Sequence, residues 1–518
     1  MFDINNFDDP EVWDTICDGD TKGVFQLESN LGRHWAKETQ PRSIKDLAAL
    51  VSLIRPGTLL AKDASGKSMT QVYADRKANK ADSPVEYLHE SLEPILKETY
   101  GVLVYQEQSM MIAQSLAGFD LKEADALRKA IGKKKADLME KVKKAFLEGA
   151  QEQGVVSNEI AEEIFGWIEK SNRYAFNKSH AVSYAINAYW SAYCKTHRRK
   201  TFYEKYLNRA EKKPKPDIEK KQLIMDAKRA GIEVLPPRLQ HLYNDFHRHS
   251  EKSEIVYGLR HVKHVGKESE KIVEYISNTD VSGYTWMDCL IHLVAGLRLN
   301  KRATIALISV GAFNGKNNRE SRQKMLYEFD SWKQLSAREQ QGIIDNYKSE
   351  DPSVYSASLA EAIENMFKTV KINSRRKPTV DDIKDSLENP FYDVEDKAGI
   401  IAIDEEKYMS CSLTCNKVDG LDLNMVTNVC QDVVNKVITK KANLAVEIER
   451  IKVIKTKKGD EMAFLTVEDG SGSLEDVTVF PEQYGSHKDL LLENNTVLLM
   501  GEIDKKRGSF IVNKVSQI

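Results

Sequence analysis

From about residue 441 onward, the spacing of apolar residues changes from a helical pattern to the alternation that is typical of β-strands. Runs such as NLAVEIERI and MAFLTVED are separated by the turn sequences KKGD, EDGSG and DKKRG. Three strands, a helical piece around YGSHKDLLLE and two more strands follow one another in the order of an OB-type barrel. We therefore predict an all-β domain over residues 441–518.

The residues before about position 230 have a different pattern, in which apolar residues recur three and four positions apart. Examples are SMMIAQSLAGF, EADALRKAIGKKK and NEIAEEIFGWIEK. This spacing predicts amphipathic helices. The sequence VLPPR, from Val234 to Arg238, marks a boundary because prolines end regular structure. We predict a mainly helical domain over residues 1–233.

Two further segments separate these domains. IVYGLRHVKHVGKESEKIVEYI places a short strand or turn and a glycine before a helix, and LNKRATIALISVGAFN predicts a helix that ends at Gly311. Short helices joined by glycine turns predict tandem helix-hairpin-helix units over residues 234–315. The polar sequence over residues 316–440 predicts helices and a linker. The expected fold is thus multidomain and mainly α-helical, with a carboxy-terminal OB-type barrel.

Composition argues against several classes of protein. The chain has 518 residues, which fits about three domains. No window approaches the roughly 18 apolar residues of a membrane-spanning helix, and the first residues are acidic, unlike a secretion signal. Only Cys411 and Cys415 of the six cysteines lie close together, without histidines at zinc spacing. We expect a soluble, cytoplasmic protein with reduced thiols, no membrane partner and no bound metal at these cysteines.

The net charge of −2 alone predicts no polyanionic partner, but the charges are unevenly distributed. Between Lys122 and Leu147, nine Lys or Arg residues stand against four Asp or Glu residues. A second basic run is CKTHRRKTFYEKYLNRAEKKPKPDIEKK. Local basic faces can bind phosphates even when the whole chain is neutral. Each run can equally be a solvated helix face.

The sequence FNKSHAVSYA, from Phe176 to Ala185, sets Lys178, Ser179 and His180 side by side at the start of a predicted helix. Neighbours on a helix diverge by about 100° and do not face each other, and no G-x-S-x-G motif surrounds the pair. A hydrolase site is therefore not indicated. Ser179 is predicted to be the helix N-cap, which would leave N–H groups beside Lys178 free to bind an anion. The alternative is a cap whose neighbours point to water.

A second candidate cluster is LRKAIGKKK, from Leu127 to Lys135. Its apolar residues form a stripe, so Arg128, Lys129 and Lys133 fall on other faces. Arginine binds phosphate oxygens through a rigid fork and lysine acts as a point charge, which suits a triphosphate or a nucleic-acid backbone. The alternative is that the lysines after Gly132 occupy a helix end, where cations are favoured in any case.

Several long strings occur together in a fixed order. They are GDTKGVFQLES, LIRPGT, ETYGVLVYQEQSMMIAQSLAGF, EADALRKAIGKKK and YAFNKSHAVSYA. In order and spacing they resemble the fingers of the bacterial replicative DNA polymerase III alpha subunits, the C family of DNA polymerases. VYGLRHVKHVG, LNKRATIALISVGAF, EEKYMSCSLTC and the terminal barrel are similar to that family's hairpin, linker and OB segments, so the resemblance covers essentially the whole chain.

This resemblance implies template-directed addition of nucleotides to a primer during DNA replication. The primer 3′-hydroxyl attacks the α-phosphate of the incoming deoxynucleotide, assisted by Mg²⁺ ions that palm aspartates hold. The partners implied are primer-template DNA and a deoxynucleoside triphosphate (dNTP). The fingers residues implied on the nucleotide side are Arg55, Arg128, Lys129, Lys133, Lys134, Asn177, Lys178, Ser179 and His180.

The family's phosphoesterase-like (PHP), thumb and palm domains precede GDTKGVFQLES, whereas here only 18 residues do. Asp18 and Asp20 form a D-x-D pair, but Asp20 belongs to the fingers motif and the strand context of a palm is missing. We assign no catalytic residue and no metal ligand, and expect a split or phage-type polymerase with PHP, palm and thumb on a separate chain. The alternative is a noncatalytic DNA-binding or regulatory remnant.

The resemblance also implies DNA contacts outside the fingers. At the first hairpin these are Lys263, His264, Gly266 and Lys267, although the usual glycine-hydrophobic-glycine turn reads His264-Val265-Gly266. In the barrel they are the turn residues Lys457, Lys458, Lys505, Lys506 and Arg507, with Phe464 and Phe480 as stacking faces. The alternative is that these lysines aid solubility and both phenylalanines are core. For a sliding clamp, only the poor motif QKMLYEF is found.

Overall fold

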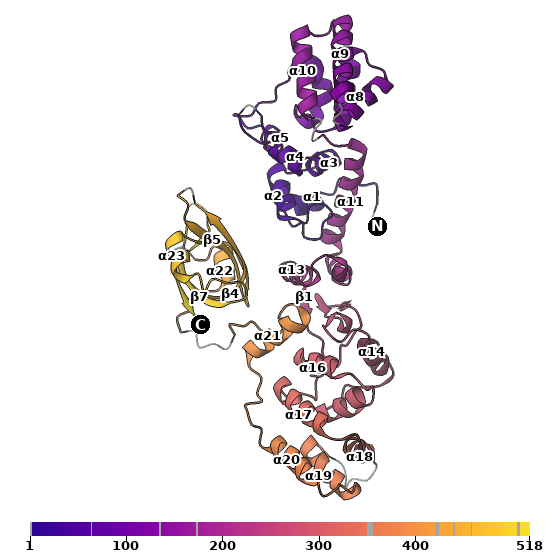
Figure 1. Ribbon diagram of the computed structural model, residues 1–518, viewed down its shortest axis with the longest axis vertical. Helices are drawn as coiled ribbons and strands as arrows, with labels where there is room; N and C mark the ends of the chain where they lie inside the picture. The colour runs from indigo at the N-terminus through magenta and orange to yellow at the C-terminus, as the bar shows by residue number, and fades with distance from the viewer. Residues whose placement is uncertain are drawn as a thin grey trace. The chain divides into compact units, whose positions relative to one another are not determined.

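The computed structural model describes most of the chain and divides it into two compact units, residues 1–203 and residues 204–518. The described residues are 3–63, 65–133, 136–171, 175–349, 356–419, 424–438, 441–456, 458–504 and 508–518, without the side chains of 131–133 and 136–137. Figure 1 shows helices along most of the chain and a barrel at its carboxy-terminal end. The predicted fold class is confirmed. No helix among the described residues combines the length and apolar character that crossing a membrane requires.

The first unit is helical. Its helices are α1 (Pro10–Cys17), α2 (Asn30–Thr39), α3 (Ile44–Leu53), α4 (Pro56–Leu60), α5 (Met69–Lys77), α6 (Glu93–Leu96), α7 (Gln106–Ala117), α8 (Leu121–Lys133), α9 (Ala136–Gln153), α10 (Asn158–Ser171) and α11 (Lys178–His197), with 3₁₀ turns η1 (Glu90–Leu92) and η2 (Lys97–Thr99); α12 (Arg199–Leu207) leads into the second unit. Asp9, Ser29, Ser43 and Ser68 cap four of them by accepting backbone N–H groups. Such side chains begin helices because the first N–H groups have no partner within the helix.

Two apolar cores organise this unit. One joins α1, α2, α3, α5 and α11 around Trp13, Tyr73 and Tyr189. The other joins α6 to α10 around Phe146 and Phe165. Figure 1 shows α11 beside α1 and α3, and α8, α9 and α10 as a group of their own. The buried face of α11 is alanine-rich, which lets its backbone approach α3 closely.

The two cores are joined by a short backbone pairing. Residues Tyr105 and Phe176 form an isolated parallel bridge. The Phe176 N–H donates to the Val104 carbonyl at 2.9 Å, and the Gln106 N–H donates to the Phe176 carbonyl at 3.0 Å. The segment that enters α7 and the segment that enters α11 are therefore held together, and both helices begin at this junction.

The second unit begins with helices and a three-stranded sheet in the order β1-β3-β2. Its strands are β1 (Glu233–Leu235), β2 (His247–Arg248) and β3 (Glu254–Val256), with η3 (Ala210–Lys212) and α13 (Pro216–Arg229) before them. The hairpin region follows as η4 (Leu259–His261), α14 (Glu268–Asn278), α15 (Trp286–Asp288), the π-helix η5 (Cys289–Ala295) and α16 (Lys301–Ser309). These short helices are joined by tight turns at 262–267 and 296–300.

The region after the hairpins is also helical. It contains α17 (Arg322–Gln334), α18 (Ala337–Tyr347), α19 (Leu359–Thr369), α20 (Lys377–Glu388) and α21 (Ala398–Met409). A buried ion pair connects it to the hairpins: Arg322 bonds Glu405 at 2.9 Å and donates to the Ser309 carbonyl at 2.8 Å. Both side chains are at most 4% exposed. Since an unpaired buried charge is costly, this pair fixes α17 and α21 against the end of α16.

The carboxy-terminal domain is a closed barrel in the strand order β4-β5-β6-β8-β7. Its elements are α22 (Cys430–Val434), β4 (Lys441–Lys455), β5 (Glu461–Asp469), β6 (Gly472–Val479), α23 (Pro481–His487), β7 (Thr496–Ile503) and β8 (Phe510–Gln517). β6 and β8 pair in parallel, and the other neighbours are antiparallel. This order, with a helix between the third and fourth strands, is that of the predicted OB-type barrel.

The carboxyl group of Glu328 on α17 should make the stability of the second unit depend on pH. Glu328 is only 8% exposed, and burial raises the pKa of its carboxyl group to about 7 from an ordinary 4.5. Its stabilising contribution is complete below about pH 4.5 and is lost as pH rises through 7. We expect Glu328→Gln to stabilise the unit at pH 8 by roughly 2 kcal/mol, with little effect at pH 5.

Urea denaturation at both pH values measures this difference. Glu320→Gln is the matched control, because Glu320 pairs at 2.7 Å with Lys324, whose charge also acts on Glu328, but Glu320 is far more exposed. A Glu328→Gln variant whose urea midpoint shifts equally at pH 5 and pH 8 would contradict the prediction.

Candidate functional site

Helix α11 begins two residues earlier than the sequence suggested. Its N-cap is Asn177, whose Oδ1 accepts the His180 N–H at 2.9 Å. The prediction that Ser179 is the cap is wrong: Ser179 lies in the first turn and its hydroxyl donates to Asn177 Oδ1 at 3.1 Å. The reason is the extended backbone at Asn177, which places the start of the helix at Lys178.

Two carboxylates lie against this helix start. Glu107, in the first turn of α7, accepts the Lys178 N–H at 2.9 Å and an Asn177 Nδ2 hydrogen at 2.8 Å. Glu98 pairs with Lys178 Nζ at 3.1 Å. The start of α11 therefore binds negatively charged groups, as its free N–H groups and dipole favour. Those groups are the chain's own carboxylates, so a phosphate ligand at Lys178 would have to replace them.

Beside the helix start, a guanidinium and four aromatic rings form a continuous row of contacts, in which the rings are edge-on or tilted to one another. Arg55 lies over the Phe176 ring, 3.6 Å from its centroid. Ring centroids are then 5.3 Å apart for Phe176 and His180, 4.0 Å for His180 and Tyr184, and 5.0 Å for Tyr184 and Phe25. Partial burial lowers the pKa of Arg55, and no described carboxylate pairs with it. This leaves a cation and exposed ring faces available to a ligand.

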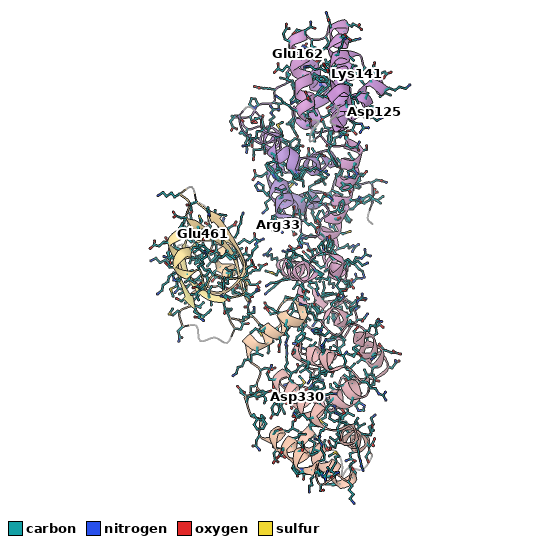
Figure 2. The ribbon with its side chains drawn as sticks, in the orientation of Figure 1. Arg33, Asp125, Lys141, Glu162, Asp330 and Glu461 are labelled. Atoms are coloured by element: carbon teal, nitrogen blue, oxygen red, sulfur yellow. The ribbon has the colours of Figure 1, made fainter. Side chains whose placement is uncertain are left out.

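The second predicted cluster lies apart from these rings, on α8. Arg128 and Lys129 both pair with Asp125 on the same helix, at 2.8 and 2.6 Å. Figure 2 labels Asp125 in the group formed by α8, α9 and α10. The Lys129 ammonium and the Arg128 guanidinium lower the pKa of Asp125. Lys133 ends α8, but its side chain, like Lys134 as a whole, lies outside the described residues.

The D-x-D pair does not have the surroundings of a metal site. Asp20 Oδ1 lies 2.5 Å from Nζ of Lys195, a side chain with no exposed surface, and Arg199 lies 3.9 Å from Asp20 Oδ2. Asp18 is the C-cap of α1. One group of three carboxylates among the described residues, Glu406, Glu447 and Glu468, is close enough to share an ion, but Lys417 and Lys221 already pair with it. Neither set of donors fits Mg²⁺, which prefers oxygen ligands without competing cations.

The first hairpin turn borders a cavity of about 570 Å³. Lys263, His264, Gly266 and Lys267 line it. His264 has φ +70° and Gly266 has φ +45°, so the turn has left-handed backbone at both positions despite the missing first glycine. Lys263 pairs with Asp217 at 3.0 Å, whereas no described carboxylate pairs with Lys267.

A second turn, over residues 296–300, escaped the sequence analysis. Arg298 there has φ +53°, and Asn300 caps α16 and lines the same cavity. Arg298, Lys301 and Arg302 are exposed. The sequence that could have indicated this turn is Gly296-Leu297-Arg298. It keeps the first glycine of the usual glycine-hydrophobic-glycine turn and lacks the last.

The barrel surface is described in part. Lys457, Lys505, Lys506 and Arg507 lie outside the described residues, and Lys458 is exposed. Phe480 is 47% exposed, so the alternative that both phenylalanines belong to the core does not hold for it. Phe464 is half-buried. Phe480 therefore offers a ring face at the surface.

The clamp-binding candidate QKMLYEF lies within α17. Its Met325 is fully buried and its Phe329 is 2% exposed. A partner cannot reach these apolar residues without unfolding the helix, so this segment does not serve as an exposed clamp motif.

Two segments of the chain match known protein families. Residues 2–154 match the model of the bacterial DNA polymerase III alpha subunit finger domain, and residues 231–325 match a helix-hairpin-helix motif. The DNA polymerase III subunit alpha of Aquifex aeolicus (strain VF5) is 33% identical over 512 residues, which are 98% of this chain and 39% of that protein. Over nearly its whole length, the chain is similar to part of the bacterial DNA polymerase III alpha subunit.

Relatives of the same name occur in Staphylococcus aureus. The protein of strain MSSA476 is 29% identical over 521 residues, and that of strain N315 is 29% identical over 514 residues. Each alignment covers 99% of this chain and 43% of the relative. The chain thus spans about two fifths of the length of the polymerase III alpha subunits that it matches.

The capping of α11 can be tested by two substitutions in neighbouring positions. Asn177→Ala removes the side chain that accepts the His180 N–H and should lower the stability of the first unit by about 1 kcal/mol. Ser179→Ala removes a peripheral hydroxyl and should change stability by less than about 0.5 kcal/mol. Thermal unfolding of both variants measures the difference. Equal destabilisation, or a larger loss from Ser179→Ala, would contradict the capping by Asn177.

Proposed function

We propose that this chain is the substrate-binding part of a bacterial-type replicative DNA polymerase. In this proposal its fingers bind the incoming dNTP, its hairpins and barrel bind primer-template DNA, and a palm on a separate chain, with PHP and thumb, completes the active site. The similarity to polymerase III alpha subunits over 98% of the chain supports the polymerase role. The reaction adds one deoxynucleotide to the primer 3′ end.

The observation that carries the nucleotide-binding role is the position of Arg55. Its guanidinium is held by the Phe176 ring and has no described carboxylate partner, and it lies beside the start of α11. Arginine that is oriented in this way can donate two hydrogen bonds to a phosphate. The rings of His180 and Tyr184 would stack against the base, and Lys178 would bind a phosphate oxygen after leaving Glu98. These contacts orient the triphosphate for in-line attack.

Mg²⁺ remains a proposed cofactor of the complete polymerase. Bound by palm aspartates, it would activate the primer hydroxyl and stabilise charge on the phosphates. We assign its ligands to the palm, because Asp20 is paired with the buried Lys195 and the three clustered glutamates are paired with lysines. In this chain Arg55 and Lys178 would supply positive charge to the triphosphate without binding the metal.

Primer extension tests whether this chain needs a separate palm-bearing chain for activity. The purified chain should not extend a primer alone and should do so when the palm-bearing chain, identified by co-purification and mass spectrometry from native extract, is added. Extension by this chain alone would refute our assignment of the catalytic carboxylates. Recovery of a palm on the same polypeptide would refute the separate chain. DNA binding without extension in any complex would favour a noncatalytic remnant.

In the active complex, Arg55→Ala should raise the KM for dNTP about tenfold, since it removes an oriented phosphate contact. Lys178→Ala should act in the same direction. Lys97→Ala is the control, because Lys97 precedes Glu98 but is 76% exposed and pairs with Glu93. Unchanged kinetics in Arg55→Ala and Lys178→Ala would exclude the proposed triphosphate site.

A further inference from the structure

The two hairpin turns lie close together and share one cavity. Residues 262–268 line it from the first turn, and Asn300 lines it from the second. Each turn leads into a helix, α14 or α16, and each contains a non-glycine residue with left-handed backbone, His264 or Arg298. Residues of both turns therefore line the same cavity.

A side-chain hydrogen bond connects the turns. Glu268, the first residue of α14, accepts an Asn300 Nδ2 hydrogen on its Oε1 at 3.1 Å. Its Oε2 pairs with Lys271 at 2.8 Å. Asn300 also caps α16, because its Oδ1 accepts the Ala303 N–H at 2.9 Å. Asn300 thus uses its oxygen for its own helix and its nitrogen for the helix of the other turn.

The charges around this connection are mixed: Glu211, Asp217 and Glu268 line the cavity together with Lys220, Arg260, Lys263 and Lys267. No described carboxylate pairs with Lys267, Arg298 or Arg302, and Lys301 makes only a 3.6 Å contact with Asp330. Glu268 is the carboxylate between the turns, and its side chain is 17% exposed. The Lys271 ammonium and the Asn300 amide lower its pKa, so it is ionised at neutral pH. A carboxylate is favoured in the first turn of a helix, although its charge weakens phosphate binding nearby. Beyond this, Glu268 makes a hydrogen bond to Asn300 of the other turn.

We infer that Glu268 and Asn300 hold the two turns as one docking surface for the backbone of duplex DNA, with Glu268 acting as a positioning residue. The inference rests on the proposed DNA-binding function and adds Arg298 and Arg302 to its contacts. Two turns fixed relative to each other can bind neighbouring phosphates without losing freedom on binding, which strengthens the complex. Turns that move independently would bind as two weaker sites.

Duplex binding by the full chain tests this inference, measured by the anisotropy of a fluorescein-labelled 20-base-pair DNA over a salt series. Glu268→Gln removes the charge and keeps an oxygen that accepts from Asn300. Glu268→Ala removes both. We expect Glu268→Gln to bind at least as tightly as the unchanged chain and Glu268→Ala to bind roughly three to ten times more weakly. If Glu268 acted only through its negative charge, both variants would bind DNA more tightly than the unchanged chain.

Asn300→Ser gives an independent measurement, because serine still caps α16 but cannot reach Glu268 with a donor. It should weaken binding as Glu268→Ala does. As a single substitution, Arg298→Ala should lower the slope of log affinity against log salt concentration by about one phosphate contact. Combined with Glu268→Ala, which uncouples the turns, the same substitution should cost less affinity. Circular dichroism of each variant checks that the fold is kept.

The possible results distinguish the proposed DNA binding by the hairpins from the inferred coupling of the two turns by Glu268 and Asn300. If Lys267→Ala and Arg298→Ala weaken binding but Glu268→Ala binds as tightly as Glu268→Gln, the hairpins bind DNA and the inferred coupling is wrong. If the chain does not bind duplex DNA, or neither cation matters, the proposed DNA surface and the coupling both fail. Weaker binding by Glu268→Ala and Asn300→Ser, with Glu268→Gln unaffected, supports the coupling.

Discussion

The pairing of Phe176 with residues 104–106 is the contact on which the first unit depends. It is only one bridge with two backbone hydrogen bonds, of 2.9 and 3.0 Å, yet it joins the chain segments that enter α7 and α11. Each of these helices belongs to a different apolar core. The side chains at the candidate nucleotide site follow from it, because Phe176 supports Arg55 and the next residue caps α11.

That junction also explains the electrostatics of the site. Since α7 and α11 both begin there, Glu107 lies in the first turn of one helix and against the first turn of the other. A carboxylate is favoured at either helix start. A phosphate ligand with more charge and more oxygens than a carboxylate can compete for the same N–H groups. The chain's own carboxylates thus satisfy the start of α11 in this structure, and a triphosphate bound there as we propose would have to displace them.

The sequence was most informative where a pattern repeats over many residues. Strand alternation with spaced turns predicted the OB-type barrel, and three- and four-residue spacing predicted the helical fingers, because burial on one face constrains many positions at once. Ser179 was misassigned because asparagine and serine are equally good caps, and only the backbone decides between Asn177 and Ser179. Glu98 and Glu107 lie 80 and 71 residues before Lys178, so no local spacing could pair them with it. The predicted contacts of Arg128 and Lys129 likewise missed Asp125, although it lies on the same helix at ion-pair spacing.

The first hairpin turn shows why a missing glycine need not mean a missing function. Glycine is usual in such turns because it adopts positive φ without steric cost. His264 adopts φ +70° all the same, at a cost on the order of 1 kcal/mol for a residue with a side chain. Its surroundings offset this cost: the Lys263 N–H donates to the Tyr408 carbonyl at 2.9 Å, and the His264 ring packs edge-on to Tyr408 at 6.1 Å. Helix α21 therefore maintains the turn's backbone where the sequence motif alone would not, so the left-handed conformation of this turn does not depend on a first glycine.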